Sequence, residues 1–492
     1  MTGPDLNRPV LVLTALGILA LGGCRTGPDY KPPPPPAAPA DWPTRQPEPF
    51  VAPAGTAEDL ESWWMVFEDT TLNRLIRDAR IANLRLAQAV ARVRQSRARL
   101  AFARSQRWPI LQVGASGGAS KLPDGGPLSQ IAPDGGFEAE ALWTVGVDAA
   151  WEVDLFGRVS RSIEAAGASY RASIEDYRYV LVTLLAEVAL VYVDVRTFQQ
   201  RIALARENAE TQRRSLALTR DRFESGLSSE LDVAQAEANL ADTEAQIPPL
   251  EAAVALGIDR LAVLLGVEPG AVDQQLYTAR PIPRAEDTVA VGLPADLVRQ
   301  RPDIRAAESK LAAQTARVGV AEAELYPLLA IEGRFGFFAR DLGDLFDSGN
   351  EAWEVKVPLA WTAIDGGARR SRVQLEDAGV QRATASYRET VLLALAEVRD
   401  ALVSLARERD RSARLASAVR AYQRAVDLVL VQYETGLTDF QNVLDMQRSL
   451  FQLQDAFAAS EGRVSTDLVN VYKALGGGWS PADTVAASAG AS

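Results

Sequence analysis

Residues 143–157 read WTVGVDAAWEVDLFG, and residues 353–367, which lie 210 positions later, read WEVKVPLAWTAIDGG. The same offset relates Gly226-Leu227 to Gly436-Leu437, and no gap is needed between these matches. In both halves a strand bracketed by tryptophans precedes a very long helical pattern, a glycine turn and a second helical pattern. The sequence therefore predicts an internal two-fold repeat.

The repeated strand has one apolar and one polar face, because side chains alternate between the two faces of a strand. Its tryptophans are eight residues apart, which is ~26 Å along the strand and ~20 Å of height at a tilt of about 40°. That height is close to the apolar band of outer-membrane barrels, although a half-buried strand of a soluble sheet would show the same alternation. The predicted aromatic girdle is Trp143, Trp151, Trp353 and Trp361. The predicted water-facing residues are Asp148, Glu152, Glu332, Arg334, Glu354 and Lys356.

Only four such strands occur, in two hairpins over residues 109–155 and 327–363. Four strands cannot close into a barrel, and unpaired backbone groups cannot face lipid. Two chains would give eight strands with a filled interior, whereas three would give twelve strands and leave a channel. We therefore expect a homotrimer whose subunits share one membrane β-barrel in contact with outer-membrane lipid.

The helical patterns are too long for a compact domain. One runs from about 71 to 107 and a related one from 294 to 327, while longer ones run from 157 to 223 and from 367 to 433. Returning helices follow over 228–265, where Pro248-Pro249 should break the first of them, and over 438–475. Their apolar steps resemble coiled-coil packing with wet faces, so the fold class is mainly α: a coiled-coil helical barrel joined to the membrane strands. A soluble scaffold rod is the alternative.

The composition argues against most enzymes and against nucleic-acid binding. The chain has no histidine, one cysteine and a formal net charge of −12, with basic residues interleaved among acidic ones. Histidine is a leading general base and metal ligand, so we expect no catalysis, no cofactor and no metal site. Carboxylate-only chemistry passes this test but finds no further support. The charge pattern predicts no nucleic-acid partner.

The N-terminus is typical of an exported lipoprotein. An apolar run over residues 10–20 leads to Leu21-Gly22-Gly23-Cys24, where the cysteine would be acylated and become the first residue of the mature chain. An ordinary signal peptide is the alternative. The proline-rich residues after Cys24 predict an extended tether. We divide the chain into a signal peptide (1–23), a lipid-anchored segment (24–60), a first repeat (61–266), a connector (267–292), a second repeat (293–478) and a disordered tail (479–492).

Several motifs resemble those of the TolC-type outer-membrane efflux channels, specifically the NodT-type, OprM-like lipoprotein branch. They are Gly27-Pro28-Asp29-Tyr30, residues 151–158 (WEVDLFGR), Gly292-Leu293-Pro294 with residues 301–305 (RPDIR), and residues 472–479 (YKALGGGW). The resemblance implies a trimer with a twelve-stranded barrel, a twelve-helix periplasmic tunnel and a mixed belt built from the N-terminal segment, the connector and the C-terminal region. It also implies two partners, a periplasmic adaptor and an inner-membrane pump.

In this family the two helical turns form the periplasmic tip of the tunnel, where the adaptor docks. The matching positions for tip and adaptor docking are Phe223, Gly226, Leu227, Tyr433, Gly436 and Leu437. Candidates for a closed gate are Asp427, Leu430 and Glu434. The expected function is a passive exit duct of a tripartite efflux system, and a non-transport periplasmic scaffold is the alternative. The cargo is not specified by the sequence.

Overall fold

The computed structural model describes residues 25–33, 51–52, 60–121, 139–285, 289–290 and 300–481. The chain divides into two compact units. We call the first the sheet unit; it comprises Met1–Pro33, Arg94–Arg171 and Glu308–Ser386. We call the second the helical unit; it comprises Pro34–Val93, Ala172–Ala307 and Tyr387–Ser492. Cys24 and the rest of the predicted signal peptide lie outside the described residues.

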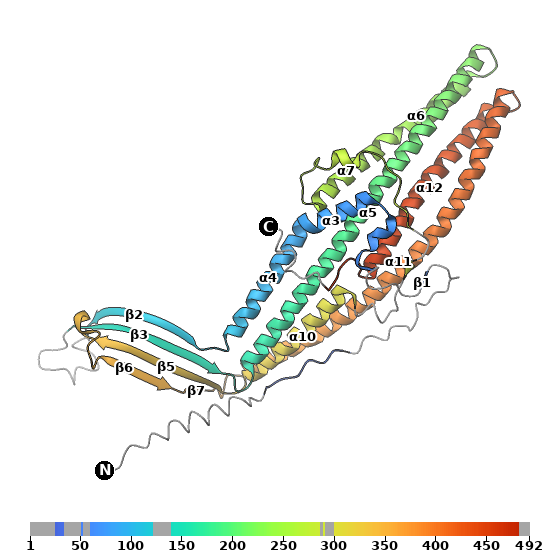
Figure 1. Ribbon diagram of the computed structural model, residues 1–492. Coiled ribbons are helices and arrows are strands. Elements are labelled where there is room, and N and C mark those ends of the chain that lie inside the picture. Colours follow the sequence, from blue (N-terminus) through green and yellow to red (C-terminus); the bar gives the residue numbers. More distant parts are fainter. Residues whose placement is uncertain are drawn as a thin grey trace, which may run out of the picture. The chain divides into compact units, whose positions relative to one another are not determined.

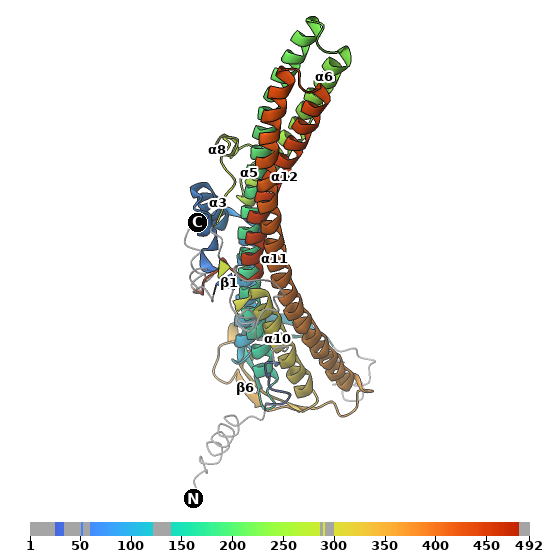
Figure 2. The ribbon, with the colours of Figure 1, turned by 90° about the vertical axis from the view of Figure 1, so that its right-hand side faces the viewer.

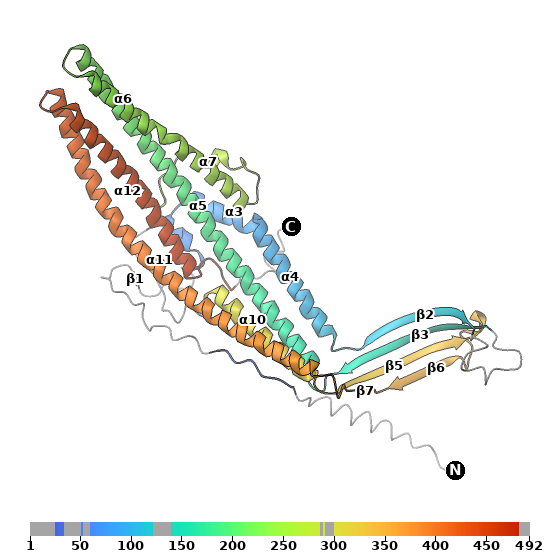
Figure 3. The same ribbon diagram turned by 180° about the vertical axis from the view of Figure 1, so that it is seen from behind.

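The sheet unit contains an antiparallel sheet in the order β2-β3-β5-β6, with β7 also paired to β5 (Figures 1 and 3). Its strands are β2 (Ile110–Ser120), β3 (Glu140–Val153), β5 (Leu328–Ala339), β6 (Glu351–Lys356) and β7 (Leu359–Ala360). The short turn η3 (Leu342–Asp344) lies between β5 and β6. Asp148 lies opposite both Gln112 and Arg334, so β3 is central and pairs on both sides.

The fourth predicted strand is not continuous, which corrects the sequence analysis. It is interrupted between β6 and β7 at Val357 and Pro358. Proline has no N–H to donate to a ladder, so a strand commonly breaks there. The Pro358 carbonyl still accepts a hydrogen bond from the Ala330 amide at 3.1 Å, which keeps the two short strands on the same neighbour.

Helices pack against one another in the sheet unit through small side chains. Parts of α4 (Leu84–Ser105), α5 (Arg158–Glu224), α10 (Pro302–Ala323) and α11 (Ala368–Glu434) belong to it. Ala168 of α5 and Ala312 and Ala313 of α10 form a buried cluster on which Tyr30 packs. Small residues let helix axes approach closely, so this part of the fold is held by tight helix contacts rather than by large apolar groups.

The helical unit is built on long hairpins. It contains parts of α5 and α11, together with α6 (Glu230–Ala245), α7 (Ile247–Leu264) and α12 (Phe440–Ala474) (Figure 2). Helices α5 and α11 are each 67 residues long, and their first residues are separated by the same offset that relates the two halves of the sequence. The predicted break in the first returning helix is confirmed: α6 ends before Gln246, and α7 begins at Ile247 with Pro248 and Pro249 in its first turn.

The first predicted helix, over 71–107, is in fact two helices. Helix α3 (Thr70–Ala82) ends at Asn83, and α4 begins at the next residue. The Asn83 side chain accepts a hydrogen bond from the Leu86 amide at 3.0 Å and donates one to the Leu264 carbonyl at 2.7 Å. Asn83 therefore caps α4 and ties it to the end of α7, so the interruption is stabilised by a tertiary contact.

Segments from three parts of the sequence meet in the helical unit. The short strand β1 (Val51–Ala52) pairs in parallel with β4 (Val289–Ala290). The turn η1 (Trp63–Phe67) places Trp63 on Tyr472, with ring centroids 5.5 Å apart. The short helix α8 (Asp273–Leu276) follows α7. The N-terminal segment, the connector and the C-terminal region therefore lie together, as the family resemblance implied.

The C-terminal boundary predicted from the sequence also needs correction. Trp479, which the sequence analysis placed in the disordered tail, contacts two guanidinium groups: its ring centroid lies 4.5 Å from that of Arg178 and 5.3 Å from that of Arg305. Such cation–π contacts hold an aromatic ring in place. The described chain extends to Pro481, and the remainder of the predicted tail lies outside the described residues. Among the helices described, none is both long and apolar enough to cross a membrane.

Candidate functional site

The predicted water-facing residues lie on one face of the sheet. Side chains that are directly paired across antiparallel strands point to the same side, so the register places Asp148, Arg334 and Glu354 in one row. Arg334 contacts the Asp148 carboxylate at 2.6 Å. Glu332 and Lys356 form the next row of the same face, and Lys356 also contacts Glu354 at 2.8 Å. Exposed pairs of this kind stabilise a fold by at most about 1 kcal/mol, so this row matters mainly for the charge that it presents.

Glu152, also predicted to face water, forms an ion pair at the end of β3. Its carboxylate accepts hydrogen bonds from the guanidinium of Arg158, the first residue of α5. The hydrogen bond to Glu152 raises the pKa of Arg158, although burial acts in the opposite direction. This ion pair therefore joins the polar face of the sheet to the helix that follows it.

The opposite face of the sheet carries large apolar side chains that nothing in the described chain covers. Val113 is 80% exposed, Trp353 76% and Val355 64%. Contiguous exposed apolar surface on a folded protein marks a contact with lipid or with another protein. Only the charged face of the sheet is therefore suited to contact with water.

The four tryptophans occupy equivalent positions in the two hairpins. The Trp151 indole N–H donates to the Arg107 carbonyl at 3.0 Å, and that of Trp361 donates to the Leu325 carbonyl at 3.1 Å. Each bond joins the tryptophan near the end of a hairpin to the chain two residues before the proline that precedes that hairpin's first strand. The duplicated sequence thus makes the same closing contact twice.

The tryptophans of the two hairpins are not level with each other in the strand register. On β5, Trp143 lies opposite Ala339, whereas Trp353 lies opposite Phe335, four residues away. In strands that lean relative to an axis, residues in one row lie at different heights along that axis. If the strands are tilted, this four-residue shift would allow the tryptophans of both hairpins to lie at the same two heights along the axis.

The two hairpin turns have matching geometry. Gly226 and Gly436 adopt φ values of +73° and +74°, which side chains other than glycine rarely tolerate. The Leu227 amide donates to the Arg222 carbonyl at 2.7 Å, and the Leu437 amide donates to the Gln432 carbonyl at 2.8 Å. These six-to-one bonds end both long helices in the Schellman arrangement.

The apolar side chains beside these turns differ in exposure. Leu437 is 79% exposed, Leu227 66% and Phe223 43%, so all three are accessible on the described chain. Tyr433 is only 3% exposed, because its ring packs on Phe440 with centroids 5.3 Å apart. Tyr433 therefore belongs to the apolar core beneath the turn, whereas Phe223, Leu227 and Leu437 are the accessible apolar residues of the predicted docking set.

Arg222 is a residue that the sequence analysis missed. Its guanidinium lies 4.8 Å from the Tyr433 ring centroid and donates to the carbonyls of Tyr433 and Glu434 at 3.1 and 3.2 Å. It thereby fastens the end of the first long helix to the end of the second. In the duplicated sequence the matching residue is Gln432, so only the first copy carries this arginine.

Two of the three predicted gate residues share an exposed helix face. Asp427 and Glu434 are exposed, and they are seven residues apart on α11. Leu430 is half-buried and packs on the core cluster beside Val429. Val431, four residues after Asp427, is 58% exposed and lies on the face of the two carboxylates. Helical spacing could have identified Val431 as the apolar member of that face.

Cys24, the predicted lipidation site, lies outside the described residues. Among the residues that the structure does describe, no group of three or more Cys, Asp or Glu side chains is arranged to hold a metal ion.

Comparison with known proteins identifies the fold. The model of the outer membrane efflux protein family matches residues 75–267 and 293–477. The solvent efflux pump outer membrane protein SrpC of Pseudomonas putida is 32% identical over 478 residues, covering 95% of this chain and 98% of SrpC. Outer membrane protein OprJ of Pseudomonas aeruginosa is 30% identical over 482 residues, covering 96% of this chain and 97% of OprJ.

A solved structure agrees with the relatives found by sequence. The outer-membrane channel OprN superposes with a TM-score of 0.87 at 35% identity, covering 93% of this chain and all of that one. The fold of the chain is therefore that of the TolC-like outer-membrane channels. With its two-faced sheet and paired helical hairpins, the chain belongs to the outer membrane efflux protein family.

Proposed function

We propose that this protein is the outer-membrane channel of a tripartite efflux system and provides a passive exit duct for small molecules. The observation that carries the proposal is the sheet, which exposes apolar residues on one face and a row of charges on the other while both of its edges are open. Such a sheet fits a wall that separates lipid from water. The family relationship supports the outer membrane as its location.

The open edges support a homotrimer. Strands β2 and β6 each have one side without a partner strand in the described chain. Unpaired backbone groups in lipid cost several kcal/mol each, so these edges must pair with other copies. Three copies provide twelve strands, which leave an aqueous interior between polar faces such as that of Asp148 and Arg334. The two repeats would then alternate around one barrel.

The N-terminus, the long helices and the helical turns have further roles in this function. Cys24 carries the lipid anchor, and the long helices form a tunnel in the periplasm. The exposed side chains of Phe223, Leu227 and Leu437 offer an apolar docking surface for a periplasmic adaptor, through which an inner-membrane pump delivers the cargo. The carboxylates of Asp427 and Glu434 remain candidates for the closed gate.

Single-channel recording tests this function. The purified protein in planar lipid bilayers should give stepwise conductance, and the same preparation should migrate as a heat-modifiable trimer on gels. A periplasmic scaffold lipoprotein, the alternative, would bind membranes without conducting ions. A stable oligomer that gives no conductance when the tips are loosened by Arg222→Ala would refute the duct.

A further inference from the structure

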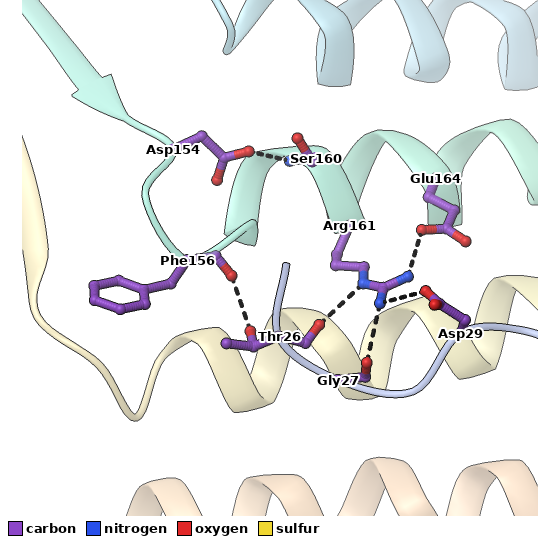
Figure 4. Close-up of polar contacts among 8 residues, drawn as sticks. All are labelled: Thr26, Gly27, Asp29, Asp154, Phe156, Ser160, Arg161 and Glu164. Atoms are coloured by element: carbon purple, nitrogen blue, oxygen red, sulfur yellow. Dashed lines mark hydrogen bonds and ion pairs between the residues drawn. The ribbon is translucent and has the colours of Figure 1, made fainter. Parts of the chain in front are cut away.

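Residues 25–33 belong to the segment that the sequence predicts to be an extended tether, and in the structure they lie bound against α5 and α10 in the sheet unit. Figure 4 shows the contact, which centres on Arg161 in the first turn of α5. Arg161 is 2% exposed. A buried guanidinium requires partners for its donors and for its charge.

The partners of Arg161 come mainly from the N-terminal segment. Its Nε donates to the Thr26 carbonyl at 3.0 Å, and one terminal nitrogen donates to the Gly27 carbonyl at 3.0 Å and to the Asp29 carboxylate at 2.8 Å (Figure 4). The other terminal nitrogen donates to Glu164 of the same helix at 2.8 Å. The planar guanidinium of Arg161 therefore binds two main-chain carbonyls at once, a geometry that the single ammonium of lysine cannot reproduce.

The segment also fits the surface sterically. The Thr26 amide and hydroxyl both donate to the Phe156 carbonyl, at 3.2 and 2.9 Å. Gly27 has a φ of +86°, and a Cβ added there would overlap the backbone of Gly319 in α10. A Cβ added to Gly319 would in turn lie 2.9 Å from the Arg161 stem. The site therefore needs glycine on both surfaces.

The equivalent site generated by the internal repeat lacks this arrangement. The residue 210 positions after Arg161 is Ser371, and the residue 218 positions before Gly319, the offset that relates Pro109 to Pro327, is Ala101. Neither can serve in the same way, because serine has a single short donor and alanine carries the Cβ that the fit excludes. The two features occur only where the N-terminal segment lies, which argues against a general packing role.

We infer that Arg161 is a positioning residue that holds the acylated N-terminus at the junction of β3 and α5. The inference rests on the proposed acylation of Cys24. Arg25 lies against this junction, since a Cβ on Gly157 would be 3.1 Å from the Arg25 Cα. By this inference, acyl chains on Cys24, the residue before Arg25 in the sequence, enter the membrane beside the end of the lipid-facing strand β3.

Docking also depends on both halves of the fold. Thr26 contacts the start of α5, whereas the Tyr30 hydroxyl donates to Glu308 of α10 at 3.3 Å. The segment can bind only after these two helices have packed together. The bound conformation of the segment therefore depends on α5 and α10 being packed together.

A spin label directly tests the contact of Arg161 with residues 26–29, which we call the clamp. Lys31 is exposed, and a nitroxide attached at Lys31→Cys in the purified channel should give an immobilised spectrum. Arg161→Ala should lose the immobilised component, and Arg161→Lys should lose part of it, because one ammonium cannot span both carbonyls. Arg382→Ala, which removes an exposed arginine of α11 in the same unit, is the matched control and should change nothing.

Gly27→Ala covers the case in which Arg161→Ala fails to fold, because it alters only the bound segment. It should also release the label. A label that stays immobile in both Arg161→Ala and Gly27→Ala would overturn the clamp. Label stoichiometry tests acylation separately: one nitroxide per chain is expected, and two would show a free Cys24 thiol.

Protease treatment tests the position of the lipid. The bond after Arg25 is a trypsin site, and cleavage there removes Cys24 with its acyl chains. In channels carrying a metabolic fatty-acid label, the wild type and Arg382→Ala should keep the label, whereas Arg161→Ala should lose it. Equal loss of the fatty-acid label from all three proteins would contradict a held anchor. An unlabelled wild type would contradict acylation, and the nitroxide spectra would then still test whether Arg161 holds the segment.

Discussion

The two faces of the sheet can be tested with neighbouring alanines on one strand. Ala149 lies on the apolar face of β3 and Ala150 on the polar face, where its register partner on β5 is Glu332. Ala149 is two residues from Trp151, ~7 Å along the strand. A lysine on the lipid face costs roughly 2–4 kcal/mol at mid-depth and less toward the interface, so Ala149→Lys should cost about 2 kcal/mol per chain.

Threefold symmetry would multiply this cost to about 6 kcal/mol per trimer. Ala150→Lys should be nearly neutral, because the new ammonium remains in water beside the Glu332 carboxylate. The heat-stable trimer extracted from outer membranes should fall sharply for the first variant and stay at the wild-type level for the second. Ala150→Lys should instead lower the permeability ratio of cations to anions relative to the wild type.

The selectivity measurement makes the test specific to the faces. A substitution that merely disturbs β3 would reduce the trimer in both variants and would leave the permeability ratio of cations to anions unchanged. If Ala149→Lys assembled normally, or if it altered selectivity as Ala150→Lys does, the assignment of lipid and water to the two faces would be refuted.

Three further predictions concern the helical unit. Arg222→Ala removes the bonds that fasten the two hairpin turns, so it should raise single-channel conductance without weakening the trimer on gels. Trp479→Ala removes two cation–π contacts worth about 2 kcal/mol together, so the thermal midpoint should fall by roughly 2 °C for a chain of this size. Partial desolvation on α5 raises the pKa of Asp194, an otherwise exposed residue, against the opposing effect of Arg260, so folding favours its protonated form. Wild-type stability should therefore fall as pH rises above about 4, the ordinary pKa of an aspartate, and the stability of Asp194→Asn relative to the wild type should rise over the same range in thermal melts.

The long elements were predictable because their signals are local. Hydrophobic periodicity and the absence of proline define α5 and α11, and Gly226 and Gly436 mark the turns at their ends. The alternation around Trp143 and Trp151 predicts both the strand and its two faces. These features depend on spacing along the chain, which the sequence displays directly.

The interruptions were harder to predict for two different reasons. Pro358 fits the alternation of the fourth strand, and only its missing N–H argues against a continuous ladder. Asn83 fits a helical pattern on both sides, and the break becomes favourable through its bond to Leu264, 181 residues away. No local propensity records that second contact.

The two arginines that organise the structure were missed because their partners are main-chain carbonyls far away in the sequence. Arg161 reaches Thr26, 135 residues before it, and Arg222 reaches Tyr433, 211 residues after it. Carbonyls carry no residue-specific signature. One signal was nevertheless present: each arginine is replaced in the other copy of the repeat, by Ser371 and by Gln432.

The central claim is that the open edges of the sheet are closed by other copies of the chain. Paired cysteines, one on β2 and one on β6, scanned along both strands, test it most directly under oxidising conditions. The account predicts a register in which intermolecular disulfides form in membranes and yield covalent dimers and trimers, but nothing larger. Cross-links confined to single chains, or a ladder that continues beyond three, would contradict it.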